Sequence, residues 1–372
     1  MNAIAIDIGM ALCSAATAYA LLALVALFKA RRPVRAVAAI CTPVSILKPL
    51  HGVEPRLYDN LRSFCLQDYP SFQLLFGVRD EADPALEVAR RIRREFPKLD
   101  IAVVVDARLH GHNHKVSNLT NILDRAHHPL LVIADSDICV GPDYLRRVCA
   151  PLARPDVGIV TCLYRGRALG GQWSRLGALF INEWFAPAVH IAQLFGSQAF
   201  GFGATLALRR ETLDAIGGFQ SITDELADDY RLAERVREAG LRTELSDYVV
   251  TTDVIEQSAR QLMTHELRWL RTIRMLNPLG YAFMFISSGL AVATLGAALT
   301  GWTAAALVLL AIVGIARAAL HFVVTPRTAN WPWRVVRSLP LVVLRDVLNL
   351  VLWGGAFASR QVAWAGRELH LR

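Results

Sequence analysis

The sequence predicts an α/β domain with a mainly parallel sheet, connected to membrane helices on both sides. Short apolar runs alternate with amphipathic stretches between about residues 36 and 257, and long uncharged runs flank this region. Alternating strands and helices imply a parallel sheet covered by helices. The 372-residue chain is 54% apolar and only 19% charged. It is therefore more apolar than an ordinary soluble domain, as membrane segments would make it.

The first uncharged run, residues 8–28, is long enough to cross a membrane as one helix. A basic cluster follows the run, and the positive-inside rule places this cluster in the cytoplasm. A signal peptide is the alternative, but its basic residues would precede the apolar run. We therefore expect residues 1–35 to form an N-terminal transmembrane anchor and its basic flank. The cluster consists of Lys29, Arg31, Arg32 and Arg35.

The C-terminal part, residues 278–372, is expected to be a second transmembrane region. Its apolar sequence suits two helices at roughly 279–299 and 303–324, with a turn near Gly301. A third stretch, 339–357, contains Arg345 and Asp346. Charged groups inside a membrane need a partner. We expect a third span with an Arg–Asp pair, and a shallow re-entrant helix is the alternative.

The region between the membrane segments, 36–257, is expected to be a cytoplasmic domain. Its predicted strands are short and rich in Val, Ile and Leu, which is typical of strands buried on both faces. These strands cover residues 44–50, 73–78, 101–105, 130–134 and 157–163. The helical patterns between them cover residues 56–66, 84–96, 116–126 and 142–152.

Acidic residues follow two of the predicted strands. Asp80 ends the second strand, and Asp135 and Asp137 end the fourth. Ligands of open α/β sheets bind beyond the carboxyl ends of the strands. Oxygen ligands from a D-x-D pair suit a hard divalent cation. A third acidic pair, Asp228 and Asp229, begins a helical pattern; read alone, it is also compatible with an ordinary acidic helix start.

The net charge of +8 suits either nucleic acid or an anionic membrane surface. Much of the basic charge flanks the membrane runs, at 29–35, 260–274 and 327–337. We therefore expect membrane lipids, and no nucleic acid, as the partner of these basic segments.

Eight motifs, taken in order, resemble family 2 glycosyltransferases of the GT-A fold, and more closely their ceramide glucosyltransferase-like branch. That branch usually ends with (Q/R)xxRW, whereas this chain has His265 followed by Arg268 and Trp269. Within the branch, the chain is most similar to glycosyltransferases of bacterial hopanoid biosynthesis. The motifs are SILKPLHG at 45–52, VRDEADPA at 78–85, HNHKVSNL at 112–119, DSD at 135–137, GFGATLALRR at 201–210, GGF at 217–219, ADDYRL at 227–232 and HELRW at 265–269.

The resemblance implies a metal-dependent, inverting glycosyltransferase with a UDP-sugar donor and a lipid acceptor. UDP-N-acetylglucosamine and a polycyclic lipid such as bacteriohopanetetrol are the expected substrates. UDP-glucose with ceramide is the alternative, followed by a processive polysaccharide synthase or a non-catalytic membrane scaffold. The implied location is the bacterial inner membrane, with several spans and a cytoplasmic catalytic domain.

The resemblance also assigns roles to individual residues. Asp229 would be the general base, and Asp137 would bind Mg²⁺ or Mn²⁺. An amphipathic helix over 258–277 is expected to lie at the membrane interface. Its HELRW motif would contact the acceptor or the diphosphate through His265, Arg268 and Trp269. The expected nucleotide-sugar ligands are Asp80, Lys115, Asn118 and Asp135.

Overall fold

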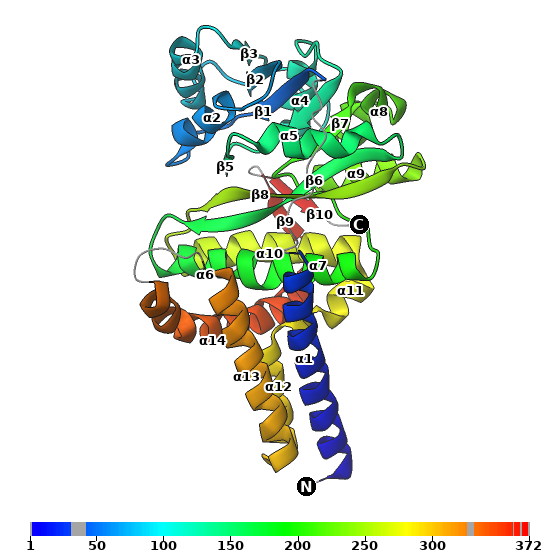
Figure 1. The fold of residues 1–372 in the computed structure, drawn as a ribbon, viewed down its shortest axis with the longest axis vertical. Coiled ribbons are helices and arrows are strands. Elements are labelled where there is room, and N and C mark those ends of the chain that lie inside the picture. Colours follow the sequence, from blue (N-terminus) through cyan, green and yellow to red (C-terminus); the bar gives the residue numbers. More distant parts are fainter. Residues whose placement is uncertain (1, 31–41, 326–330, 360, 365–366, 371–372) are drawn as a thin grey trace. The chain divides into compact units, whose positions relative to one another are not determined.

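The computed structural model describes residues 2–30, 42–325, 331–359, 361–364 and 367–370 (Figure 1). The chain divides into two compact units, each described by itself. The sheet unit contains residues 33–167 and 197–253, and the helical unit contains residues 1–32, 168–196 and 254–372. Residues 168–196, which fall inside the predicted cytoplasmic domain, therefore cluster with the apolar helices. Three basic residues expected to flank the first span, Arg31, Arg32 and Arg35, lie outside the described residues.

An eight-stranded sheet with the order β3-β2-β1-β4-β7-β6-β8-β5 forms the centre of the sheet unit. The first four strands pair in parallel, and β7 runs antiparallel to both β4 and β6. The α/β fold class is thus confirmed. The strands are β1 Val44–Pro49, β2 Phe72–Val78, β3 Asp100–Val105, β4 Leu130–Ile133, β5 Ile138–Cys139, β6 Val157–Ala168, β7 Leu206–Arg209 and β8 Arg242–Val254.

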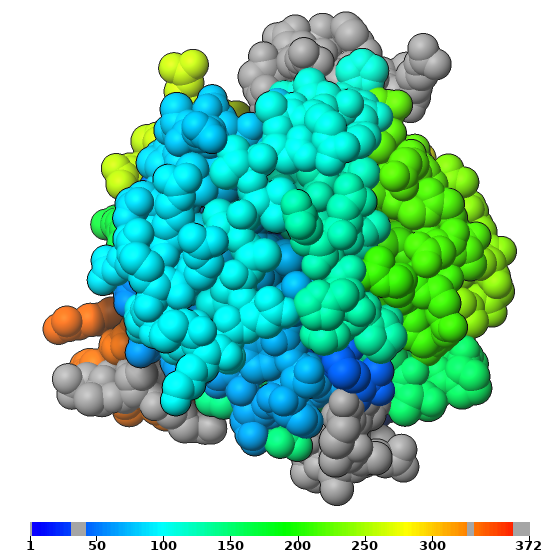
Figure 2. All heavy atoms as spheres, turned by 90° about the horizontal axis from the view of Figure 1, so that it is seen from above, coloured from blue at the N-terminus to red at the C-terminus, as the bar shows by residue number. Residues whose placement is uncertain are grey.

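Helices cover both faces of this sheet, so alternate residues of β1 enter different cores. Ile46 packs in one core with α2, α3 and α5, and Leu47 packs in the other with α4, α8 and α9. This two-sided burial explains why the strand is mostly apolar, with Ser45 and Lys48 as its polar residues. Figure 2 shows one face of the molecule, on which the blue-to-cyan segments lie beside the green ones. The helices are α2 Leu57–Cys65, α3 Ala85–Glu95, α4 His114–Leu123, α5 Tyr144–Cys149, η1 Ala150–Ala153, α8 Arg210–Ala215, η3 Phe219–Ile222 and α9 Asp228–Glu238.

Two helices of the helical unit, α1 and α13, are long and apolar enough to cross a membrane. The segments 278–287 and 289–299 add a third if they form one span, although they meet at 76°. The turn predicted near Gly301 is present, with positive φ angles at Gly301 and Trp302. The elements are α1 Ala3–Ala30, α6 Gln172–Phe180, η2 Ile181–Phe185, α7 Ala186–Leu194, α10 Ala259–Leu276, α11 Pro278–Phe283, η4 Met284–Ser287, α12 Gly289–Leu299, α13 Ala304–Val324, α14 Trp331–Gly355, η5 Ala356–Ala358, β9 Gln361–Trp364 and β10 Arg367–His370.

The predicted Arg–Asp pair in the last apolar stretch is wrong. Arg345 of α14 binds Glu266 of α10 through two nitrogen–oxygen contacts of 2.7 and 2.5 Å. Asp346 accepts hydrogen bonds from Trp184 Nε1 and from the Ala291 amide. Adjacent residues of a helix point in different directions, so they find different partners. α14 is not among the candidate spans, and it lies across α12 and α13 within this unit (Figure 1).

Two glycines allow α1 and α12 to pack closely. A Cβ atom on Gly296 would lie 2.6 Å from the Gly9 carbonyl oxygen and 2.7 Å from Cys13 Sγ. We expect Gly296→Ala to lower the free energy of unfolding by about 1–3 kcal/mol, because overpacking forces the helices apart. The loss should appear as a lower Tm of the detergent-solubilised protein. Gly314→Ala is the control, since nothing lies within 4 Å of its added Cβ; an equal loss there would contradict the packing argument.

Candidate active site

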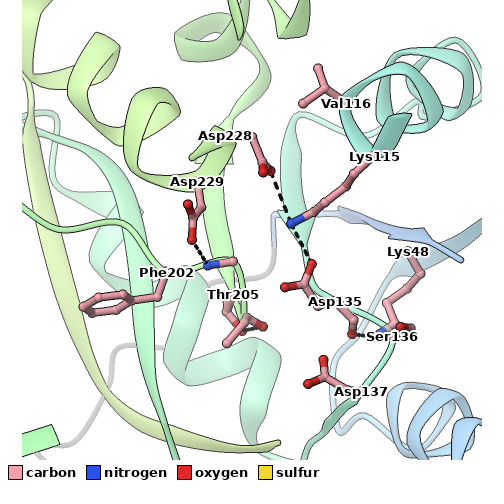
Figure 3. Close-up of polar contacts among 12 residues, drawn as sticks. Lys48, Lys115, Val116, Asp135, Ser136, Asp137, Phe202, Thr205, Asp228 and Asp229 are labelled. Carbon is pink, nitrogen blue, oxygen red and sulfur yellow. Dashed lines mark hydrogen bonds and ion pairs between the residues drawn. The ribbon is translucent and has the colours of Figure 1, made fainter. Parts of the chain in front are cut away.

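Charged side chains from two segments of the sheet unit converge on Lys115 (Figure 3). The Lys115 Nζ atom lies 2.7 Å from Asp135 Oδ1, after β4, and 3.2 Å from Asp228 Oδ2, at the start of α9. Burial lowers the pKa of Lys115, but the carboxylates of Asp135, Asp228 and Asp229 raise it above its usual value overall. The ammonium group therefore stays charged and holds these two segments together.

The start of α4 fixes the position of Lys115. Asn113 is the N-cap of this helix, and its side-chain oxygen accepts a hydrogen bond from the Val116 amide. The Asn113 Nδ2 atom donates to the carbonyl of Glu225, just before α9. One side chain thus begins the helix and connects it to the loop that carries the acidic pair.

Asp229 is held by two backbone amides at the same site. Its Oδ2 atom accepts a hydrogen bond from Gly203 at 2.7 Å, and its Oδ1 atom accepts one from Tyr230 at 2.8 Å. Burial and the neighbouring Asp228 raise the pKa of Asp229 to about 6, although Lys115 opposes this shift. A carboxylate with a pKa closer to neutrality is a stronger base than an ordinary Asp, which suits general-base chemistry.

Asp137 is the last residue of the DSD turn, and its side chain contacts β8. Its Oδ2 atom accepts a hydrogen bond from Thr252 Oγ1 at 2.5 Å. Burial and the nearby Asp135 raise the pKa of Asp137 to about 7. Burial and a neighbouring carboxylate both disfavour the charged form of Asp137, and a bound cation would oppose both effects.

Lys48 of β1 contacts the DSD turn. This contact was not predicted from the sequence. The side chain is fully buried, and its Nζ atom donates to the Asp135 carbonyl at 2.5 Å while lying 4.0 Å from the centre of the Phe64 ring. Burial lowers the pKa of Lys48 to about 8, against the opposing effect of Asp137 and Asp135. The available signal was a lone lysine inside an apolar strand, SILKPL.

The donor set of this turn fits a hard divalent cation. Asp135 and Asp137 offer carboxylate oxygens, and Glu54 adds a third carboxylate that binds Ser136 Oγ. The Glu54 Oε2 atom is buried without a hydrogen-bond partner. Oxygen-only ligands of this kind suit Mg²⁺ or Mn²⁺.

Gly203 occupies the point where these groups meet. A Cβ atom on this residue would lie 2.9 Å from Asp135 Oδ2, 3.2 Å from Lys115 Nζ and 3.3 Å from Asp229 Oδ2. The GFGATLA segment therefore brings a bare backbone between the charged side chains, where any larger residue would intrude.

Two other predicted donor ligands lie on the sheet unit. Asp80 follows β2, is exposed, and accepts a hydrogen bond from the Ala82 amide. Since β2, β1 and β4 are parallel, Asp80 lies at the same sheet edge as Asp135. Asn118 is buried, and its Nδ2 atom donates to the Gly77 carbonyl at 2.9 Å. The structure thus gives Asn118 a contact with β2, and its role toward a nucleotide stays a prediction.

The HELRW residues belong to α10 of the helical unit. His265 Nδ1 lies 2.5 Å from Glu256 Oε1, and the His265 ring packs edge-on against Trp269 with centroids 4.4 Å apart. Glu256 is buried and was not recognised from the sequence. The residue that departs from (Q/R)xxRW is therefore fixed by its own carboxylate partner. The roles of His265, Arg268 and Trp269 toward a substrate stay predictions.

A cavity of about 680 Å³ lies away from this cluster. It is lined partly by Pro129, Leu130, Arg209 and Arg210, at the amino end of β4, whereas Asp135 follows the carboxyl end. None of the residues of the charged cluster lines this cavity, so the cavity is not part of the candidate site.

Comparison with known families identifies the class of protein as a glycosyltransferase. The family model of glycosyl transferase family 21 matches residues 8–372, so the chain belongs to this family. Ceramide glucosyltransferase 1 of Caenorhabditis elegans is 26% identical over 229 residues, which cover 61% of this chain. Ceramide glucosyltransferase of Komagataella phaffii is 33% identical over 116 residues, covering 30% of this chain and 23% of the yeast protein. The chain spans about half the length of the first Caenorhabditis relatives.

Among solved structures, the chain is similar to a mannosyltransferase from Pyrobaculum calidifontis in complex with GDP-Man and Mn²⁺. The match covers 93% of this chain and 99% of that one, at 20% identity and a TM-score of 0.49.

We expect Gly203→Ala to reduce transferase activity strongly while leaving the fold intact. The added Cβ would displace the flexible end of Asp135 rather than backbone, so the site changes more than the core. Activity and Tm should be measured on the same preparation. Gly171→Ala is the control, since nothing lies within 4 Å of its added Cβ. Full activity in Gly203→Ala would contradict the placement of the site.

The raised pKa of Asp229 predicts the pH dependence. The carboxyl is protonated below its pKa of about 6, and only the ionised form can accept a proton. We expect kcat/KM to rise with pH through about 6 and then level off, at a saturating concentration of divalent cation. Asp229→Asn should lower kcat by about 10²–10⁴ and abolish this step in the profile. An Asn variant with the full rate would exclude Asp229 as the base.

Proposed function

We propose that this chain is a membrane-bound, metal-dependent, inverting glycosyltransferase that moves a sugar from a UDP-sugar to a lipid hydroxyl. The observation that carries the proposal is the meeting of Lys115, Asp135 and Asp229 around Gly203. This arrangement combines a cation for phosphates with a carboxylate of raised pKa, beside a turn suited to a divalent ion.

The chemistry needs a deprotonated acceptor and a stabilised leaving group. Asp229 accepts the proton of the acceptor hydroxyl while the hydroxyl oxygen attacks the anomeric carbon. The bond from that carbon to the donor phosphate breaks, and UDP leaves with the electron pair. The attacking oxygen approaches opposite the leaving group, so the anomeric configuration inverts.

Negative charge develops on the departing diphosphate, and the site has two means of balancing it. A divalent cation bound by Asp137, with Asp135 nearby, would supply Lewis-acid charge neutralisation. The Lys115 ammonium provides a fixed positive charge beside Asp135. Asp80 and Asn118 are proposed to contact the nucleotide.

The helical unit supports a lipid acceptor. α1 and α13 are candidate spans, and α10 carries the Arg268–Trp269 motif on an amphipathic helix. We propose that His265, Arg268 and Trp269 contact the acceptor or the diphosphate. The location is proposed as a bacterial inner membrane, with the sheet unit in the cytoplasm.

Two lipid acceptors are proposed, from different observations. The overall sequence resemblance favours UDP-N-acetylglucosamine and a hopanoid such as bacteriohopanetetrol. The match to ceramide glucosyltransferases favours UDP-glucose and ceramide. Both pairs require the same base and the same leaving-group stabilisation.

A product assay tests the function and distinguishes the acceptors. Membranes containing the protein are incubated with each UDP-sugar in combination with each lipid. The masses of the lipid products are then measured by mass spectrometry. We expect a product with one added sugar from the hopanoid and UDP-N-acetylglucosamine. Membranes with the Asp229→Asn variant are the matched control. Product from ceramide alone would change the acceptor, and no product from any pair would refute the proposed function.

A further inference from the structure

Two histidines and a carboxylate lie together at the amino-terminal edge of the sheet. Asp100 is the first residue of β3, and His127 and His128 precede β4. Since these strands belong to the parallel half of the sheet, this edge is opposite the one that carries Asp135 and Asp137. The cluster is therefore separate from the candidate active site.

The three side chains are close enough to share one ion. His127 Nε2 lies 3.3 Å from Asp100 Oδ2, and one ligand atom from each residue lies within 4.8 Å of the others. In a tetrahedral zinc site, bonds of roughly 2.0–2.2 Å place ligand atoms about 3.4 Å apart. Both Asp100 and His127 are exposed, so small side-chain rotations can close this difference.

The loop that carries the histidines is held by contacts that do not involve their rings. Arg210 donates from NH2 to the Ala126 carbonyl at 2.8 Å and from its backbone amide to the Pro129 carbonyl at 2.8 Å. The His128 amide donates to Oγ of the buried Ser45. A braced backbone that leaves the rings available is what a metal site requires of its surroundings.

We propose that Asp100, His127 and His128 bind a divalent transition-metal ion, with Zn²⁺ as the best match. Two imidazole nitrogens and one carboxylate oxygen are ligands that zinc accepts, whereas Mg²⁺ takes oxygen ligands. The exposed fourth position would hold water. The cluster at this edge would therefore prefer Zn²⁺, whereas the DSD turn at the opposite edge suits Mg²⁺ or Mn²⁺.

Zinc binding to the full-length protein tests this proposal. Tag-free protein in detergent is stripped with a chelator, supplied with excess Mg²⁺, and titrated with Zn²⁺ by calorimetry at about pH 7.5, above the usual histidine pKa. Co²⁺ absorption serves as a second readout of nitrogen ligation. We expect one ion per chain, with affinity at least ~10-fold weaker in the His127→Ala/His128→Ala variant and in Asp100→Asn.

Two control variants make the result specific. His112 Nδ1 lies 2.6 Å from Asp224 Oδ1 in an exposed pair, so His112→Ala removes a comparable histidine that lacks this third partner. Asp137→Asn changes the DSD turn of the candidate active site, at the opposite edge of the sheet, and leaves Asp100, His127 and His128 unaltered. Both should bind zinc like the unaltered protein. Absence of zinc binding, equal binding in the double-histidine variant, or equal loss in His112→Ala would overturn the proposal. Because the readout is metal binding, a failed transferase assay leaves this test unaffected.

Discussion

The ion pairs of Lys115 are the interaction on which the site depends. Its ammonium group joins Asp135, at the end of a strand, to Asp228, at the start of a helix that is 93 residues away in the chain. Each carboxylate near it is partly buried, and without a cation their mutual repulsion would separate the two segments. Burial and Asp228 raise the pKa of Asp229, Lys115 opposes this shift, and two backbone amides hold the Asp229 oxygens. The charges of Lys115 and the nearby Asp residues therefore affect both the packing of the two segments and the pKa of Asp229.

A second lysine, Lys48, adds a further positive charge in the core. Lys48 places a cation next to the DSD turn, in a strand whose other side chains are apolar except for Ser45. Burying a charge without a partner is strongly unfavourable, so its contact with the Asp135 carbonyl and the nearby carboxylates is essential. In the helical unit, Arg345 meets the same requirement through Glu266. In both cases the buried charge has an opposite charge or a carbonyl oxygen within reach.

Asp229 and Asp137 illustrate how environment separates the roles of similar groups. Both carboxyls have raised pKa values, but Asp229 binds two backbone amides and Asp137 binds a hydroxyl beside other acidic groups. The first is suited to accept a proton and the second to hold a cation. His265, by contrast, is positioned by Glu256 rather than by backbone.

The sequence by itself determined the parallel strands β1 to β4 and the acidic residues that follow β2 and β4, because two-sided burial makes such strands short and rich in Val, Ile and Leu. It also indicated α1, α10 and the turn at Gly301. Only the tertiary structure decided the partners: Lys48 beneath Asp135, Thr252 on Asp137, and Glu266 rather than Asp346 on Arg345. These contacts join residues 79 to 115 positions apart, and local periodicity carries no information about which distant side chain satisfies a buried charge.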